Sequence, residues 1–178
     1  MGSSFSAMDS RAEHHTRATR ESATPPVCII GAGPGGLSAA VALGRHGIPF
    51  RILDAGRKPG GIWDIDRART PMYESAHFIS SKTLSGFPDF PMPDDYPRHD
   101  QIQAYIEAYA AHHELTGEID FGCTVTSVRP ASGGARGDGR AGSASGSGAG
   151  DGIAGSASGP RWTVAWTGPD GEVSDTFS

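Results

Sequence analysis

The stretch VCIIGAGPGGLSAAVALGRHGIPFRILD, residues 27–54, decides the fold of this chain. It opens with four apolar residues, which suit a strand buried on both faces of a parallel sheet. A glycine-rich turn follows, and behind it small and apolar residues recur at the spacing of one helical face: Leu37, Ala40, Val41 and Gly44. Gly47 and Pro49 predict the end of this helix, and residues 50–54 predict a second strand. Strand, turn, helix and strand in this order predict a βαβ unit.

The glycine-rich turn matches the pattern G-x-G-x-x-G, and its context gives each glycine a physical role. The first permits the tight turn, the second lets backbone approach a pyrophosphate, and the third lets the helix pack closely on the strands. The N–H groups and dipole of the helix favour a diphosphate, and the carboxylate that ends the second strand can accept hydrogen bonds from ribose hydroxyls. A purely structural glycine turn is the alternative. The candidate binding residues are Gly31, Ala32, Gly33, Pro34, Gly35, Gly36 and Asp54.

A second match to the same pattern is a decoy. It lies at residues 150–155, inside a tract from Ala131 to Pro160 that is almost entirely Gly, Ala, Ser, Asp and Arg. No apolar strand precedes this match and no amphipathic helix follows it, so it lacks the context that the binding mechanism needs. A tract of this composition cannot bury enough apolar surface to offset the entropy of ordering. Residues 131–160 are therefore predicted to form a low-complexity, disordered hairpin loop.

Length and composition limit the classes of protein to which the chain can belong. Its 178 residues suffice for one domain, predicted over residues 25–178 behind a polar, disordered tail at 1–24. A cleaved targeting segment is the weaker interpretation of that tail. A net charge of −5 without a basic stripe argues against nucleic acid as a partner, and no apolar run is long enough for a membrane span. Two cysteines and no secretory signal predict a cytoplasmic protein.

The rest of the chain predicts further elements of an α/β domain. Residues 55–97 are rich in Pro, Gly and aromatics, which predicts an irregular segment ordered by packing over a ligand or another domain. Asp100 and Gln103 form a capping-box pattern that predicts a helix, with an apolar stripe at Ile102, Tyr105, Ile106 and Tyr109 and an end at Gly117. A third parallel strand is expected at 118–121. Three antiparallel strands are expected at 123–129, around 162–166, where Trp162 and Trp166 face the core, and at 172–177.

Several of these motifs together resemble the flavin-containing monooxygenases and their Baeyer–Villiger relatives. The run Gly60-Gly61-Ile62-Trp63 after the acidic strand end is similar to their G-G-x-W. Residues 73–82, the FPDFP of 87–91 and the DYP of 95–97 resemble the segment that these enzymes place beside the flavin. The resemblance covers residues 26–178 without the low-complexity loop. It implies a Rossmann fold of the FAD type, with a βαβ unit in a parallel sheet and a small antiparallel β-meander.

The resemblance also implies FAD as cofactor and assigns residues to it. The turn from Gly31 to Gly36 would hold the pyrophosphate and Asp54 the adenosine ribose. The middle of the cofactor would be lined by Gly61, Ile62 and Trp63, the backbone of Val125 would face adenine, and Ser80 lies in the segment beside the flavin. In the family, NADPH reduces the flavin and a C4a-hydroperoxide transfers one oxygen to a small-molecule substrate, a soft nucleophile or a ketone.

Two departures from the family pattern limit what the resemblance implies. Ile79 stands where many flavin monooxygenases have an asparagine near the reactive face of the flavin, and an isoleucine cannot form that hydrogen bond; no catalytic residue is assigned. The second dinucleotide motif and the F-x-G-x-x-x-H fingerprint are absent from the sequence. The resemblance therefore implies an incomplete FAD-binding domain, truncated before the NADPH domain, for which a missing C-terminal half or a partner chain supplies the NADPH site.

Two alternatives to a working monooxygenase stay open. A pyridine-nucleotide disulfide reductase would place a redox cysteine pair after the second strand, and residues 55–122 contain no cysteine. A truncated flavin-binding fragment without turnover is the expectation for the 178-residue chain alone. The histidine pairs 14–15 and 112–113 suggest a metal only superficially, because adjacent histidines on a helix point to different faces. No metal site is predicted.

The motif and its decoy predict opposite effects of the same substitution. Gly33→Val should abolish FAD binding, because a branched side chain would occupy space that the pyrophosphate needs. Gly152→Val, and deletion of residues 132–158, should leave binding unchanged, because closure entropy changes by only about 0.6 kcal/mol per doubling of loop length. The measurement is titration of each variant with FAD by flavin fluorescence. Loss of binding in the deletion variant would show that the loop takes part in the site.

Overall fold

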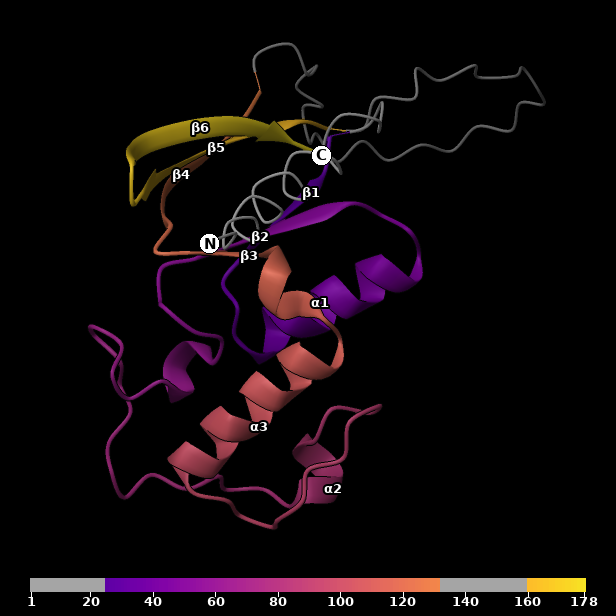
Figure 1. Cartoon of the computed structure of the whole chain (residues 1–178), viewed down its shortest axis with the longest axis vertical. Helices are drawn as coiled ribbons and strands as arrows, with labels where there is room; N and C mark the ends of the chain where they lie inside the picture. The colour runs from indigo at the N-terminus through magenta and orange to yellow at the C-terminus, as the bar shows by residue number, and fades with distance from the viewer. Residues whose placement is uncertain (1–24, 132–159) are drawn as a thin grey trace, which may run out of the picture.

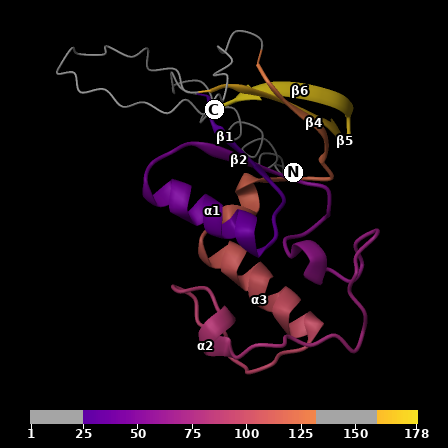
Figure 2. The same cartoon turned by 180° about the vertical axis from the view of Figure 1, so that it is seen from behind.

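The computed structural model describes residues 25–131 and 160–178, which form two three-stranded sheets and a layer of helices. The parallel sheet lies in the middle, with helices α1 and α3 on one face and the antiparallel sheet on the other (Figure 1). The view from behind shows the same order of layers (Figure 2). The predicted tail at 1–24 and residues 132–159 of the predicted loop lie outside the described residues. The predicted α/β class with a β-meander is confirmed.

The parallel sheet has the strand order β1-β2-β3. Strand β1 (Val27–Ile30) pairs with β2 (Phe50–Asp54), and β2 pairs with β3 (Ile119–Phe121). Helix α1 (Pro34–Arg45) connects the first two strands, which is the predicted βαβ unit. It ends at Arg45 with His46 as its C-cap, and Gly47 follows with a φ of +65° that suits glycine. The carboxyl ends of β1 and β2 consequently lie side by side, at the N-terminus of α1.

Side chains alternate between the two faces of the parallel sheet. Ile29, Ile52 and Ile119 belong to the core under the helices, together with the predicted apolar stripe of α1. On the opposite face, Leu53 belongs to the core under the antiparallel sheet. The expectation that β1 is buried on both faces is wrong: only Ile29 is fully buried, while Val27 and Cys28 are half-buried. The side chain of Ile30 is 54% exposed, because β1 is an edge strand of the described sheet.

Helix α3 (His99–His112) buries the predicted apolar stripe, but both of its predicted ends are wrong. The N-cap is Arg98 rather than Asp100, because Gln101 lies three residues after Arg98 and its Oε1 accepts the Arg98 N–H at 2.9 Å. At the other end, Glu114 adopts a left-handed conformation with φ of +57° and breaks the helix. Gly117 therefore falls inside the short 3-10 helix η2 (Leu115–Glu118).

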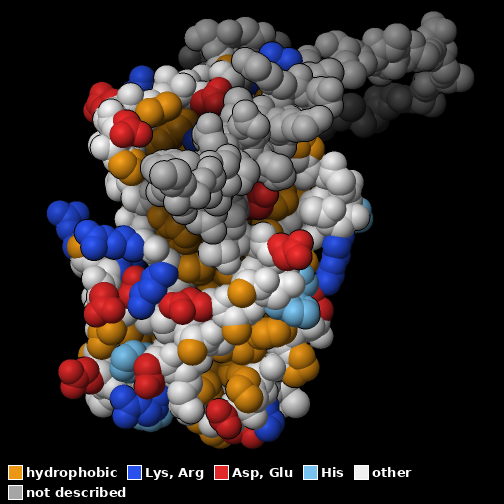
Figure 3. Space-filling model, viewed as in Figure 1, with side chains coloured by type: hydrophobic (Ala, Val, Ile, Leu, Met, Phe, Trp, Pro, Cys, Tyr) orange, Lys and Arg blue, Asp and Glu red, His pale blue; other side chains and the backbone are white. Residues whose placement is uncertain are grey.

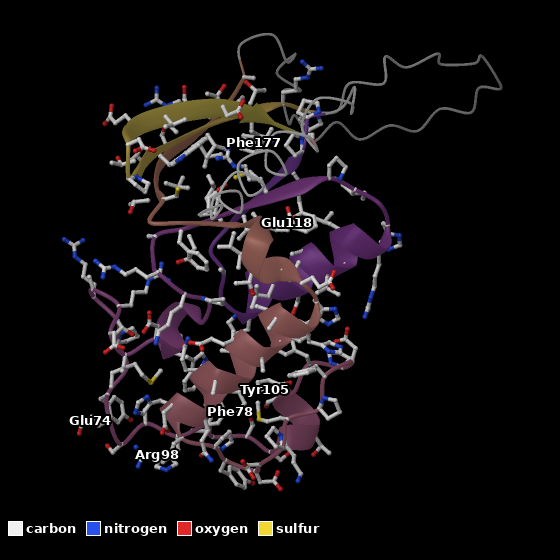
Figure 4. All side chains as sticks on the ribbon, viewed as in Figure 1. Glu74, Phe78, Arg98, Tyr105, Glu118 and Phe177 are labelled. Carbon is white, nitrogen blue, oxygen red and sulfur yellow. The ribbon has the colours of Figure 1, made fainter. Side chains whose placement is uncertain are left out.

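The segment 55–97 is irregular apart from the 3-10 helix η1 (Gly61–Trp63) and the single turn of α2 (Lys82–Ser85), a helical turn that the proline content did not predict. Its ordering comes from packing against α3. The Phe87 N–H donates to the hydroxyl of Tyr105 at 2.7 Å, and that hydroxyl donates to the Phe90 carbonyl. Phe87 also stacks on Tyr109, with ring centroids 3.6 Å apart. Figure 4 shows Tyr105 on α3, reaching this segment.

The antiparallel sheet is the predicted meander of β4 (Thr124–Pro130), β5 (Trp162–Gly168) and β6 (Gly171–Phe177). Phe177 and Trp166 are buried with Leu53 between the two sheets, and Figure 4 shows Phe177 in that position. Trp162, predicted to face the core, is partly exposed because it stands at the first position of β5. Within the described ranges, no helix has both the length and the apolar character that crossing a membrane requires.

Candidate functional site

The glycine-rich turn lies where the carboxyl ends of β1 and β2 meet the N-terminus of α1. Gly31 has a φ of +100°, a conformation that other residues rarely adopt, and its N–H donates to the Leu53 carbonyl at 2.8 Å. Gly36 lies in the first turn of α1, where a Cβ would stand 1.9 Å from the Gly31 carbonyl oxygen. Only a glycine at this position lets the helix approach the turn so closely, which is the packing role that the motif predicts for its third glycine.

The middle glycine of the motif has a role that the sequence did not show. A Cβ on Gly33 would point at Gly61 and meet its Cα at 3.6 Å, and a Cβ on Gly61 would meet the Gly33 Cα at 3.1 Å. The two glycine runs, 31–36 and 60–61, therefore lie against each other through their backbones. The Gly60 N–H also donates to the Ala32 carbonyl at 3.0 Å. A Cβ on Gly33 would make only an ordinary contact, whereas one on Gly61, whose φ is +63°, would be crowded, so the close approach depends on Gly61.

The N-terminus of α1 leaves donors available for an anion. Its N-cap is Gly33, so no side chain of the described residues caps the helix, and its first turn carries no acidic residue. Pro34 has no N–H group, and the Leu37 N–H already donates to the Gly33 carbonyl at 3.0 Å. The N–H groups of Gly35 and Gly36 have no acceptor inside the helix. Together with the helix dipole, these two donors form a site suited to a phosphate group.

Asp54 lies at the end of β2 as predicted, but its carboxylate already has several donors. It is 1% exposed; Oδ2 accepts the Ala32 N–H at 2.7 Å and Oδ1 accepts the Gly56 N–H at 2.6 Å. Arg67 adds its Nη1, 3.1 Å from Oδ1 and 3.4 Å from Oδ2. The carboxylate therefore holds the glycine turn in place and is neutralised by an arginine that sequence reasoning missed. No local pattern identifies Arg67, which lies 13 positions away in the irregular segment.

The remaining predicted site residues lie in η1, in the irregular segment before α2 and in β4. Gly61, Ile62 and Trp63 form η1, where Ile62 is exposed and Trp63 packs against Phe78 with ring centroids 5.3 Å apart. The Ser80 hydroxyl forms a hydrogen bond with the hydroxyl of Ser85. Val125 lies in β4 and packs against the core between the two sheets. The contacts described above join the glycine turn, Asp54 and the 60–61 pair into one unit. None of these contacts involves Ser80 or Val125, which lie in the irregular segment and in β4.

The segment around Ile79 presents apolar side chains to the surface. Ile79 itself is 94% exposed, and three large apolar neighbours in the segment are exposed as well: Tyr73, Leu84 and Tyr96. Hydrophobic side chains gather in the lower half of the face seen in Figure 3, over α3 and this segment. The side chain of Ile79 supplies no hydrogen bond, as the sequence predicted.

The two cysteines are both free, and their environment keeps them protonated. Burial raises the pKa of the Cys28 thiol to about 11, and burial also raises the pKa of Cys123. At neutral pH both are thiols rather than thiolates, and the thiolate is the reactive form. This environment does not suit the redox cysteine pair of a disulfide reductase.

Comparison with known proteins places this geometry in a family. Residues 25–139 match the family model described as flavin-binding monooxygenase-like. Flavin-containing monooxygenase 3 of Homo sapiens is 36% identical over 109 residues, 57% of this chain and 20% of the relative. The indole-3-pyruvate monooxygenase of Oryza sativa subsp. japonica is also 36% identical over 109 residues, 60% of this chain and 25% of the relative. The chain thus spans about a fifth to a quarter of the length of these curated relatives.

Solved structures show the same fold. The S-allyl-L-cysteine S-oxygenase of Allium sativum superposes with a TM-score of 0.65 at 24% identity, covering 86% of this chain and 35% of that enzyme. A mutant flavin monooxygenase of Stenotrophomonas maltophilia superposes with a TM-score of 0.57 at 26% identity, covering 86% and 36% of the two chains. The share of this chain that superposes is thus larger than the part that the family model matches.

Two adjacent glycines of α1 predict opposite effects of the same methyl group. Gly36→Ala places a Cβ 1.9 Å from the Gly31 carbonyl oxygen, so the helix must move, at an expected cost of about 3 kcal/mol or more in unfolding free energy. Gly35→Ala meets no atom within 4 Å and should stabilise the chain by about 0.5 kcal/mol, because alanine loses less backbone entropy. Urea unfolding followed by circular dichroism measures both. Equal stability of the two variants would contradict the packing described for Gly36.

Proposed function

Because the chain belongs to the flavin-binding monooxygenase-like family, we propose that it holds the ADP half of FAD on the glycine turn between β1 and α1. The observation that carries the proposal is the uncapped N-terminus of α1, whose Gly35 and Gly36 N–H groups have no acceptor inside the helix. The pyrophosphate lies at these donors, where the helix dipole also favours negative charge. Gly31, Ala32, Gly33 and Pro34 line the approach to them.

The ribose of the adenosine lies at Asp54, in this proposal, and shares the carboxylate with the backbone. The two N–H groups of Ala32 and Gly56 make the shorter contacts and stay in place, because they hold the turn. The longer contacts are those of Arg67 at 3.1 and 3.4 Å, so ribose hydroxyls take over lone pairs that its Nη1 occupies in this structure. Arg67 then lies beside the adenosine.

The other predicted residues line the cofactor farther from the pyrophosphate. Gly61 of η1 itself lies against the turn, and Ile62 and Trp63 follow it directly, which supports a place along the middle of FAD. Ser80 is assigned to the flavin side and the Val125 backbone to the adenine side, both on the strength of the family resemblance. Catalytic residues are not assigned, since Ile79 has no group that exchanges a proton or donates a hydrogen bond.

The activity proposed for the whole protein is that of an NADPH-dependent flavin monooxygenase acting on a small molecule, a soft nucleophile or a ketone. When bound, FAD supplies the redox chemistry with which O2 is activated. This chain supplies the binding and orientation of the ADP half. We infer that the 178-residue chain alone binds FAD without NADPH-dependent turnover, because its sequence holds one glycine motif in a strand–turn–helix context and the family uses two.

A second candidate is a flavoprotein disulfide reductase, a class that also uses FAD and a nicotinamide. The structure of a bacillithiol disulfide reductase of Staphylococcus aureus superposes with a TM-score of 0.55, at an identity of 22% that indicates fold alone. The raised pKa of both thiols in this chain disfavours that chemistry within the described residues. The monooxygenase therefore remains the favoured hypothesis.

Cofactor choice tests the proposal directly. FAD should bind the purified chain at least about 100-fold more tightly than FMN, or about 2.7 kcal/mol, because FMN lacks the adenosine half that the site contacts. Asp54→Asn should reduce the ratio of FAD affinity to FMN affinity about tenfold or more, since it removes one hydrogen-bond acceptor that the turn and the ribose share. The measurements are titrations by flavin fluorescence, and NADPH should not be oxidised by the FAD-loaded chain.

The control is Asp120→Asn, which removes a carboxylate from an ion pair with Arg51 on β2 but lies outside the proposed site. It should leave the FAD-to-FMN ratio unchanged. Equal affinity of the unsubstituted chain for FAD and FMN would contradict the assignment of the glycine turn and Asp54. NADPH-dependent oxygenation of a sulfide or ketone by the chain alone would contradict the inference that it lacks turnover.

A further inference from the structure

A glutamine on α3 is buried against the second glycine pair. Gln103 is 7% exposed, on the face of the helix that otherwise carries the apolar stripe. Its Nε2 donates to the Pro59 carbonyl at 2.5 Å and to Glu107 Oε1 at 2.6 Å. A primary amide has two N–H groups, so both donors of Gln103 are used. The bond to Pro59 joins α3 to a segment 44 positions earlier in the chain.

The other end of the amide lies against Gly60. Gln103 Oε1 is buried and finds no hydrogen-bond donor among the residues that the structure describes. A Cβ on Gly60 would stand 1.9 Å from this oxygen, and Gly60 has a φ of +142°. The amide cannot turn over, because the Pro59 carbonyl and the Glu107 carboxylate both require a donor from it. Leaving a buried acceptor unpaired costs about 1–3 kcal/mol, so this placement needs a reason beyond packing.

Gly60 also contacts the glycine turn. Its N–H donates to the Ala32 carbonyl at 3.0 Å, and the next residue, Gly61, lies against Gly33 through backbone atoms. Gln103 therefore touches one side of the 59–61 segment while the turn touches the other. Moving the amide by a few tenths of an ångström would move Gly60 and Gly61 relative to Gly33, which stands directly before the helix donors.

We propose that Gln103 is a positioning residue for the pyrophosphate: it sets how closely Gly60 and Gly61 approach the glycine turn and, through them, the space in front of the Gly35 and Gly36 N–H groups. The inference rests on the proposed function, since it concerns the same cofactor. Glu107 orients the amide so that Oε1 faces Gly60. The Nζ of Lys58 lies 3.9 Å from the same Glu107 oxygen that accepts the Gln103 amide and 3.3 Å from the buried Asp64.

The test is Gln103→Met, which keeps the length of the side chain and removes both donors and the acceptor. FAD and ADP should both bind about tenfold more weakly, by the same factor, because both carry the pyrophosphate and the 59–61 segment loses the bond to α3 that holds it at the turn. Gln101→Met is the matched control: it makes the same substitution on α3, at an exposed residue that caps the helix. It should leave both affinities unchanged. Isothermal titration calorimetry measures each Kd.

A double-variant cycle separates positioning from a general structural role. Gly33→Ala adds a Cβ 3.6 Å from the Gly61 Cα, an ordinary contact, so the chain should tolerate it. If Gln103 acts through this contact, the two substitutions should be non-additive in FAD affinity by at least about threefold, as neighbouring sites are. Additive effects would overturn the proposal. Glu107→Ala, at a partly exposed position, should weaken the binding of FAD and of ADP by about threefold. This variant tests the proposal if Gln103→Met fails to fold.

The outcomes distinguish the proposed function from the positioning role of Gln103. If the unsubstituted chain binds neither FAD nor ADP, the proposed function fails. If the chain binds both ligands and either Gln103→Met or Glu107→Ala, once folded, binds them as tightly, only the positioning role of Gln103 is overturned. Weaker binding of FAD without weaker binding of ADP would also overturn the positioning role, because Gln103 would then act on a part of FAD outside the pyrophosphate.

Discussion

The buried carboxylate of Asp54 is the interaction on which the site depends. It stands at the carboxyl end of β2 and accepts the N–H of Ala32 in the neighbouring turn and of Gly56 in its own. A charge-assisted hydrogen bond to backbone is stronger than a neutral one, and burial strengthens it further. The turn after β1 is therefore tied to the end of β2, and α1 begins where that turn ends.

Both backbone polar groups of Ala32 are used in this arrangement. Its N–H goes to Asp54 and its carbonyl accepts the Gly60 N–H, so the turn is held from β2 on one side and from the irregular segment on the other. Gly61, where a Cβ would meet the Gly33 Cα at 3.1 Å, lets the two backbones lie against each other. The donors left over are those of the first turn of α1, which point away from every protein acceptor in the helix. A rigid turn with free donors in front of it is a preorganised anion site.

Much of the fold followed from local sequence patterns. The apolar run at 27–30, the strand pattern at 50–54, the glycine motif between them and the alternation along β5 identified the βαβ unit and the meander. These patterns did not predict the side chains that reach the site through long-range contacts. Arg67 reaches Asp54 and Gln103 reaches Pro59 from positions that no periodicity connects. The start of α3 was misplaced because two capping patterns overlap at 98–103 and their side chains decide between them.

Backbone hydrogen exchange with and without FAD measures the central claim most directly, namely that the glycine turn, held by Asp54 and by the Gly60–Gly61 pair, receives the pyrophosphate. The account predicts that FAD slows exchange most strongly at residues 31–37 and 59–63 together, because both backbones become buried and ordered around the cofactor. The decoy at 150–155 should exchange at the same rate in both states. Protection at 150–155, or FAD binding that leaves 31–37 unprotected, would contradict the account.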